Sequence, residues 1–379
     1  MDDAPPATVY ADGMKAALLA DGLWINEEAS TVRFYAVGLT DEQVRVVPVT
    51  PIGCQRPRLS LITERLYFRS SKVSWWRRTP RRLAEQLREL EVDLLHAMDG
   101  SIYPLARMLG AALEVPVICS CWSTAELARI ALAGHDVSTV FVLPTPALAQ
   151  RGRELLGEKT TIELVRPGVL GGSEEVAEPL ADPESALCCL VIGDGKVDVD
   201  YLSLLRGVTM VRSRLPQLQL LLYAMGGDHH RLWQAASKLD LLGHVNLVDS
   251  APQTRQLLVQ ADVLMVPQPL GAVRTVVLEA MAAKRPVIAA VDPMLDYLLE
   301  GKTARLIAEA TADRWAEHFD QLVSMPRAFR SLGQSAAAYV KEHHQASRCV
   351  EQLLKIYRQA TGEPLQFATP PDESDESES

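Results

Sequence analysis

One stretch decides the fold of this chain: VLMVPQPLGAVRTVVLEAMAAKRPVIAA, residues Val263–Ala290. The apolar run at its start, 263–266, predicts a buried parallel strand, and the prolines and Gly271 that follow end that strand. From Arg274 onward the apolar residues take helical spacing, and residues 287–290 predict a second buried strand. A strand, a helix and a strand in this order form the repeating unit of a parallel α/β sheet.

The predicted helix begins just beyond the carboxyl end of a strand. Open α/β sheets bind ligands at that edge, and the free N–H groups of a helix N-terminus suit phosphate. Arg274 stands at this N-terminus, and Glu279 lies on the same helix within reach of ribose or sugar hydroxyls. The residues alone therefore predict a phosphate-containing ligand here.

The composition of the chain limits the number of its domains and the classes of function open to it. Its 379 residues, 48% of them hydrophobic, suffice for two domains with separate cores. No apolar run approaches the roughly 20 residues that span a bilayer, and the first six residues are no secretory signal, so we expect a cytoplasmic protein. The net charge of −10 argues against nucleic-acid binding. We expect the six cysteines to be reduced thiols, and His343-His344 to be a helix cap or a surface pair rather than a metal site.

The N-terminal part of the chain is the hardest to interpret. Residues Thr31–Val37 and Arg45–Val49 are rich in β-branched and aromatic residues and are predicted to be strands. Gly13 and Gly22 look isolated, without the strand–glycine–helix context of a ligand-binding loop.

A basic, aromatic stretch, Arg65–Arg82, stands out in a chain that is acidic overall. One interpretation is a surface for an anionic or lipid-linked molecule, or a peripheral contact with the inner face of a membrane. The alternative is a solvated loop and helix face with its tryptophans partly in the core.

The stretch 263–290 resembles the donor-sugar motif of retaining glycosyltransferases of family 4, the glycosyl transferases group 1. In that family the helix carries two glutamates eight positions apart, followed by an Ala-Met-Ala run. Glu279-Ala-Met-Ala matches the second glutamate, whereas Gly271 stands at the position of the first.

The resemblance implies the α/β GT-B architecture, in which two Rossmann-like, doubly wound domains face each other across a cleft. It implies the following boundaries: an acceptor-side domain (1–170), a linker (171–185), a nucleotide-sugar domain (186–345), a helix that crosses back (346–362) and a disordered acidic tail (363–379).

For the donor site, the resemblance implies that a nucleotide-diphosphate sugar is held without a metal, a cofactor or a dedicated nucleophile. Lys196 and the Arg274 side chain would neutralise the departing diphosphate. The backbone amides of Ala272, Val273 and Arg274 would bind phosphate, and Glu279 would hold ribose. The full set of expected donor-binding residues is Gly193, Gly195, Gly226, Gly227, Ser250, Gly271, Ala272, Val273, Arg274, Thr275 and Glu279. The family's arginine before Lys196 is absent, and Arg274 is our candidate to replace it.

On the acceptor side, His96 and Asp99 are implied as the catalytic residues. His96 could equally be a structural residue at a strand end. The family's two other histidines fall at Met98 and Trp122.

These patterns predict a glycosyltransferase that moves a sugar from a nucleotide-diphosphate sugar to an acceptor with retention, in polysaccharide biosynthesis or a related route. Two alternatives stay open: a catalytically impaired nucleotide-sugar sensor or scaffold, and a GT-B enzyme of another kind such as a sugar epimerase.

Overall fold

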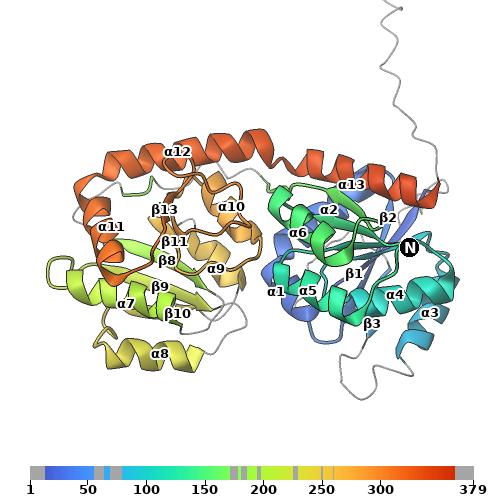
Figure 1. Ribbon diagram of the computed structural model, residues 1–379, viewed down its shortest axis with the longest axis horizontal. Coiled ribbons are helices and arrows are strands. Elements are labelled where there is room, and N and C mark those ends of the chain that lie inside the picture. Colours follow the sequence, from blue (N-terminus) through green and yellow to red (C-terminus); the bar gives the residue numbers. More distant parts are fainter. Residues whose placement is uncertain are drawn as a thin grey trace, which may run out of the picture.

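The computed structural model describes residues 13–54, 64–68, 79–170, 178–180, 186–193, 198–224, 229–248, 251–258 and 260–362. These residues form two parallel-sheet α/β domains side by side, bridged along one side by two long C-terminal helices (Figure 1). The predicted fold class is confirmed.

The first domain has a sheet with strand order β3-β2-β1-β4-β5-β6-β7 in the described part of the chain, and every pair is parallel. Its elements, in chain order, are β1 (Lys15–Leu19), α1 (Gly22–Glu27), α2 (Ala29–Asp41), β2 (Arg45–Pro51), β3 (Leu66–Phe68), α3 (Thr79–Glu89), β4 (Leu94–Ala97), α4 (Tyr103–Leu113), β5 (Val117–Ser120), α5 (Thr124–Ala133), β6 (Val140–Leu143), α6 (Pro146–Leu156) and β7 (Thr161–Leu164).

The second domain has the order β10-β9-β8-β11-β12-β13, again with parallel pairs. Its elements are β8 (Cys188–Gly193), α7 (Val199–Val211), β9 (Gln219–Ala224), α8 (His229–Lys238), β10 (Val245–Val248), α9 (Ala251–Leu258), β11 (Val263–Val266), α10 (Thr275–Ala282), β12 (Val287–Ala290), β13 (Arg305–Ile307), α11 (Ala312–Ser324), α12 (Pro326–His343) and α13 (Ala346–Thr361).

The prediction of a strand over Thr31–Val37 is wrong, because these residues lie in α2. Buried residues of α2 recur at helical intervals, namely Thr31, Phe34, Tyr35 and Leu39, so one face of the helix enters the core. The β-branched and aromatic side chains that suggested a strand pack here on a helix instead. The strand over Arg45–Val49 is confirmed as β2.

Gly22 is also not isolated. It follows β1 and opens α1, and a Cβ at this position would come within 2.8 Å of Cys54 Sγ. The strand–glycine–helix unit was missed because β1 itself, KAALL, is short and carries no alternation.

Helix α13 belongs in space to the first domain, although it ends the described chain (Figure 1). Its Cys349 Sγ lies 3.4 Å from Tyr35 Oη, and a Cβ on Gly38 would come within 2.7 Å of Val350. His344, at the C-cap of α12, is buried and its Nδ1 lies 2.9 Å from the Pro167 carbonyl oxygen. The expected pair His343-His344 thus contains a buried helix cap rather than a surface residue.

None of the helices that the structure describes is both long and apolar enough to cross a lipid bilayer.

Candidate functional site

The carboxyl ends of the two sheets meet at the loop between β11 and α10. This loop pairs with the start of α5 across the domain boundary: the Thr124 N–H donates to the Gly271 carbonyl (3.0 Å) and the Val273 N–H donates to the Trp122 carbonyl (2.8 Å). The Gly271 N–H donates to Asp292 Oδ2 at 2.7 Å. The Val273 amide, which was expected to bind phosphate, and the neighbouring Gly271 amide are therefore both used in contacts within the protein.

Helix α10 begins with a contact from the other domain. Arg274 is its N-cap and makes no capping hydrogen bond with its side chain. The Thr275 N–H donates to Glu28 Oε1 at 3.4 Å, and the Thr275 hydroxyl donates to Glu28 Oε2. Glu28 is buried, and the Thr31 hydroxyl donates to the same carboxylate. A carboxylate of the first domain thus occupies the helix terminus where a phosphate was expected.

Glu279 is also bound within the protein. Its Oε2 accepts a hydrogen bond from Arg255 Nε at 2.7 Å, and its Oε1 accepts one from the Ser30 hydroxyl. Nearby, Glu27 Oε1 accepts a hydrogen bond from the Tyr223 hydroxyl at 2.6 Å. Glu27, Glu28 and Ser30 all come from the junction of α1 and α2, which therefore covers the start of α10.

Three carboxylates face two guanidinium groups in this cluster. Burial raises the pKa of Glu28, and the nearby Arg255 and Arg274 oppose that rise. Burial lowers the pKa of Arg255, but the carboxylates of Glu279, Glu28 and Glu27 outweigh it and leave that pKa raised. Arg255 is a site residue that the sequence analysis missed, because an arginine in a short helix gives no pattern of its own.

His96 lies in the core of the first domain. It is fully buried, with Nε2 2.8 Å from the Ser120 hydroxyl and Nδ1 2.6 Å from the Tyr357 hydroxyl of α13. Burial lowers its pKa to about 3, so the ring is neutral. With both ring nitrogens in hydrogen bonds, this environment favours the structural interpretation of His96.

Asp99 lies at the carboxyl end of β4, on the side that faces the second domain. It accepts hydrogen bonds from the backbone of Asp21 (3.0 Å) and of Ser101 (2.9 Å), and from the Ser101 hydroxyl. Burial raises its pKa, and these hydrogen bonds oppose the rise.

Met98 and Trp122, which stand where the family has histidines, are both buried. The Trp122 indole N–H donates to the Met98 carbonyl at 2.7 Å, and its ring lies 5.8 Å from that of Trp24. An aromatic pair thus fills this part of the domain boundary.

Glu126 is a second residue that the sequence analysis missed. It lies in the first turn of α5, where its Oε2 accepts a hydrogen bond from the Trp122 N–H at 2.7 Å. Burial and the charge of Asp99 raise its pKa to about 7. A strongly perturbed carboxyl at the domain boundary is a candidate functional group.

The second domain also matches a known family. Residues 186–325 match the model of the glycosyl transferases group 1 family. The matched residues include β11, α10 and Arg255, so the cluster described above lies at the carboxyl edge of the matched sheet. No curated protein sequence matches the chain.

Solved structures share the fold across both domains. Sucrose-phosphate synthase of Thermosynechococcus elongatus has a TM-score of 0.70 at 16% identity, covering 92% of this chain and 99% of that one. HepE of Anabaena in complex with UDP and glucose has a TM-score of 0.70 at 13% identity, covering 90% and 99%. Trehalose 6-phosphate synthase of Burkholderia multivorans has a TM-score of 0.67 at 12% identity, covering 93% and 99%. The chain thus has the GT-B fold of glycosyltransferases.

Several expected donor residues of the group 1 domain lie outside the described residues, namely Lys196, Gly195, Gly226, Gly227 and Ser250. Gly193 ends β8, where a Cβ would come within 2.7 Å of Tyr201 and 2.9 Å of Gln268 Oε1. Close packing of the strand end explains this glycine. Among the described residues, no three His, Cys, Asp or Glu side chains group closely enough to hold a metal ion.

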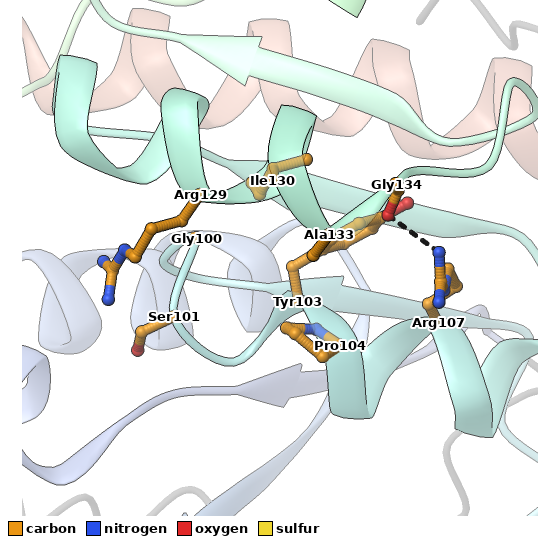
Figure 2. Close-up of a pocket in the computed structure, with 9 residues that line it drawn as sticks. All are labelled: Gly100, Ser101, Tyr103, Pro104, Arg107, Arg129, Ile130, Ala133 and Gly134. Carbon is orange, nitrogen blue, oxygen red and sulfur yellow. Dashed lines mark hydrogen bonds between the residues drawn. The ribbon is translucent and has the colours of Figure 1, made fainter.

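A cavity of about 140 Å³ lies in the first domain, lined in part by Gly100 and Ser101, which follow Asp99 in the chain (Figure 2). Its wall is mainly apolar, with Tyr103, Pro104 and Ile130 among the lining residues. Two arginines reach it: Arg129 extends from α5 toward Ser101, and Arg107 donates to the Gly134 carbonyl at 2.8 Å.

Proposed function

We propose that this protein is a glycosyltransferase that takes its sugar from a nucleotide-diphosphate donor. The observation that carries the proposal is the convergence of Arg274, Arg255 and the N-terminus of α10 at the edge of the group 1 domain. Two guanidinium groups and a helix terminus are the groups that bind a diphosphate, and in this structure the carboxylates of Glu27, Glu28 and Glu279 face them instead.

On this proposal the diphosphate binds at the start of α10 and leaves with the negative charge that develops during transfer. Arg274 and Arg255 counter that charge, with Lys196 as a further cation. Glu279 holds the ribose. The two neighbouring carboxylates, Asp99 and Glu126, mark the acceptor side. Transfer with retention, without a metal or cofactor, follows from the resemblance to family 4.

The acceptor site is proposed to be the first domain, near the cavity shown in Figure 2. Its apolar wall and its arginines, Arg107 and Arg129, suit an acceptor with an anionic group next to an apolar part, such as a lipid-linked one. The peripheral membrane contact through Arg65–Arg82 stays a proposal, because residues 69–78 lie outside the described residues.

The test is calorimetric binding of UDP-, GDP- and ADP-sugars, together with release of the nucleotide diphosphate over time. We expect one donor to bind, and Arg274→Ala and Glu279→Ala to weaken its binding at least tenfold. Arg81→Ala is the matched control, because Arg81 is an exposed arginine on α3, far from the second domain (Figure 1). Equal donor affinity in Arg274→Ala and wild type would refute this placement of the site.

The second candidate, a nucleotide-sugar sensor or scaffold, is favoured by Gly271. A glycine has no carboxylate to offer at the position of the family's first glutamate, and its φ of +57° disfavours any side chain there. A sensor would bind the donor and release no nucleotide diphosphate with any acceptor.

A further inference from the structure

The junction of α1 and α2 places a carboxylate on the proposed diphosphate site. Glu28 reaches across the domain boundary and accepts hydrogen bonds from the Thr275 N–H and hydroxyl, the first donors of α10. These N–H and O–H groups are the ones a phosphate oxygen would use.

The surrounding groups are engaged in the same way. Arg255 is paired with Glu279, and its Nη2 lies 3.5 Å from the Thr275 hydroxyl oxygen. Ser30, two residues after Glu28, donates to Glu279. A single segment of the first domain therefore occupies the proposed phosphate contact and also binds the residue proposed to hold ribose.

We propose that Glu28 is an intramolecular competitor of the donor diphosphate, so that the donor binds only after the α1–α2 junction withdraws from α10. This inference rests on the proposed function, since it names the regulation of that same site. The carboxylate copies the negative charge and the oxygen acceptors of a phosphate, and its hydrogen bonds join the first domain to the start of α10.

The energetics favour such a switch. Glu28 loses its hydration in the closed state, and it returns to water when the junction withdraws. A donor that binds only the open state shifts the equilibrium toward it, and its apparent affinity is reduced by the fraction of protein that is open. Weakening the Glu28–Thr275 contact must therefore strengthen binding of a diphosphate.

The experiment measures binding of inorganic pyrophosphate and of UDP, GDP and ADP to the full chain by calorimetry. We expect Glu28→Gln to bind at least one of these probes at least tenfold more tightly than wild type. Glu27→Gln is the matched control, because it removes a neighbouring charge of the same cluster whose hydrogen bond is to Tyr223 and not to α10. We expect it to change affinity less than threefold.

A second variant, Glu28→Asp, tests the same contact in case Glu28→Gln does not fold. Glu28→Asp keeps the charge but shortens the side chain, which withdraws the carboxylate from Thr275, so it should also bind more tightly than wild type. Equal affinities in wild type, Glu28→Gln and Glu28→Asp would overturn the proposal. An equal gain in Glu27→Gln and Glu28→Gln would also overturn it, because charge alone would then explain the effect.

The outcomes separate this inference from the proposed function. Tighter binding by Glu28→Gln without turnover of any nucleotide sugar would support the competitor and refute the transferase. Turnover with equal donor affinity in wild type and Glu28→Gln would support the transferase and refute the competitor. If no probe binds to either protein, both fail.

Discussion

At the scale of single residues, we expect the substitution of Arg255 to lower the free energy of unfolding. Arg255 pairs with Glu279, and its charge also opposes the cost of burying Glu27 and Glu28. Arg255→Ala leaves Glu28 and Glu279 without their main cation, and for buried pairs such a loss costs several kcal/mol. Because the pair is partly exposed, we expect a loss of about 2–3 kcal/mol in the free energy of unfolding, measured by urea denaturation.

The matched control for this prediction is Arg212→Ala. Arg212 pairs with Asp240, whose side chain is 92% exposed, so its removal should cost less than about 1 kcal/mol. Equal losses in the two variants would show that the cluster at α10 is no more stabilising than a surface ion pair.

Glu126 predicts a pH dependence of stability. Its pKa is raised to about 7 in the folded protein, against 4.5 for the free group, so the folded state binds the extra proton. Its contribution to stability is therefore present at pH 4.5 and lost as the pH rises through 7.

Glu126→Gln removes this titration. The variant should gain stability relative to wild type between pH 5 and pH 8, by on the order of 2 kcal/mol, as read from urea denaturation at a series of pH values. Glu89→Gln, which makes the same substitution at an exposed glutamate on α3, is the matched control. A flat difference for Glu126→Gln across this range would refute the raised pKa.

At the scale of elements, the loop before α10 depends on Gly271. Its φ of +57° is left-handed, and a Cβ there would lie 3.0 Å from Thr124 Oγ1. Gly271→Ala should cost roughly 1–2 kcal/mol in the free energy of unfolding. Gly243→Ala is the control, since its φ is not left-handed and a Cβ there meets nothing within 4 Å. A glutamate at position 271 would carry the same backbone strain.

How far the sequence predicts this structure depends on the element. The strand–helix–strand unit at 263–290 was predictable, because its apolar runs and its prolines are local signals. Helix α2 was not, because Phe34 and Tyr35 have strand propensity and only tertiary packing shows that they share a helix face.

In the candidate site, too, local contacts were predictable and contacts between distant elements were not. Arg274 and Glu279 could be placed on one helix from their spacing alone. Arg255 and Glu28 come from distant elements, and only the folded chain brings them to α10. Spacing cannot reveal such contacts between domains.

At the scale of the whole molecule, α13 ties the end of the chain to the first sheet. The Tyr357 hydroxyl contacts His96 Nδ1 in the core, and removing it leaves that nitrogen buried without its partner. Tyr357→Phe should therefore cost roughly 1–3 kcal/mol, and limited proteolysis should release the C-terminal helix faster. Tyr339→Phe on α12, whose side chain is only half-buried, should behave like wild type. Unchanged proteolysis in Tyr357→Phe would contradict the prediction.

The position of α13 has a consequence for how the protein is made. The first domain leaves the ribosome before the second, yet the face of α2 that carries Tyr35 and Gly38 is covered by residues 349 and 350. About 190 further residues, from the end of β7 to Tyr357, must be synthesised before His96 meets its partner. During that interval the nascent first domain displays an apolar surface, and it becomes complete only when the last helix arrives.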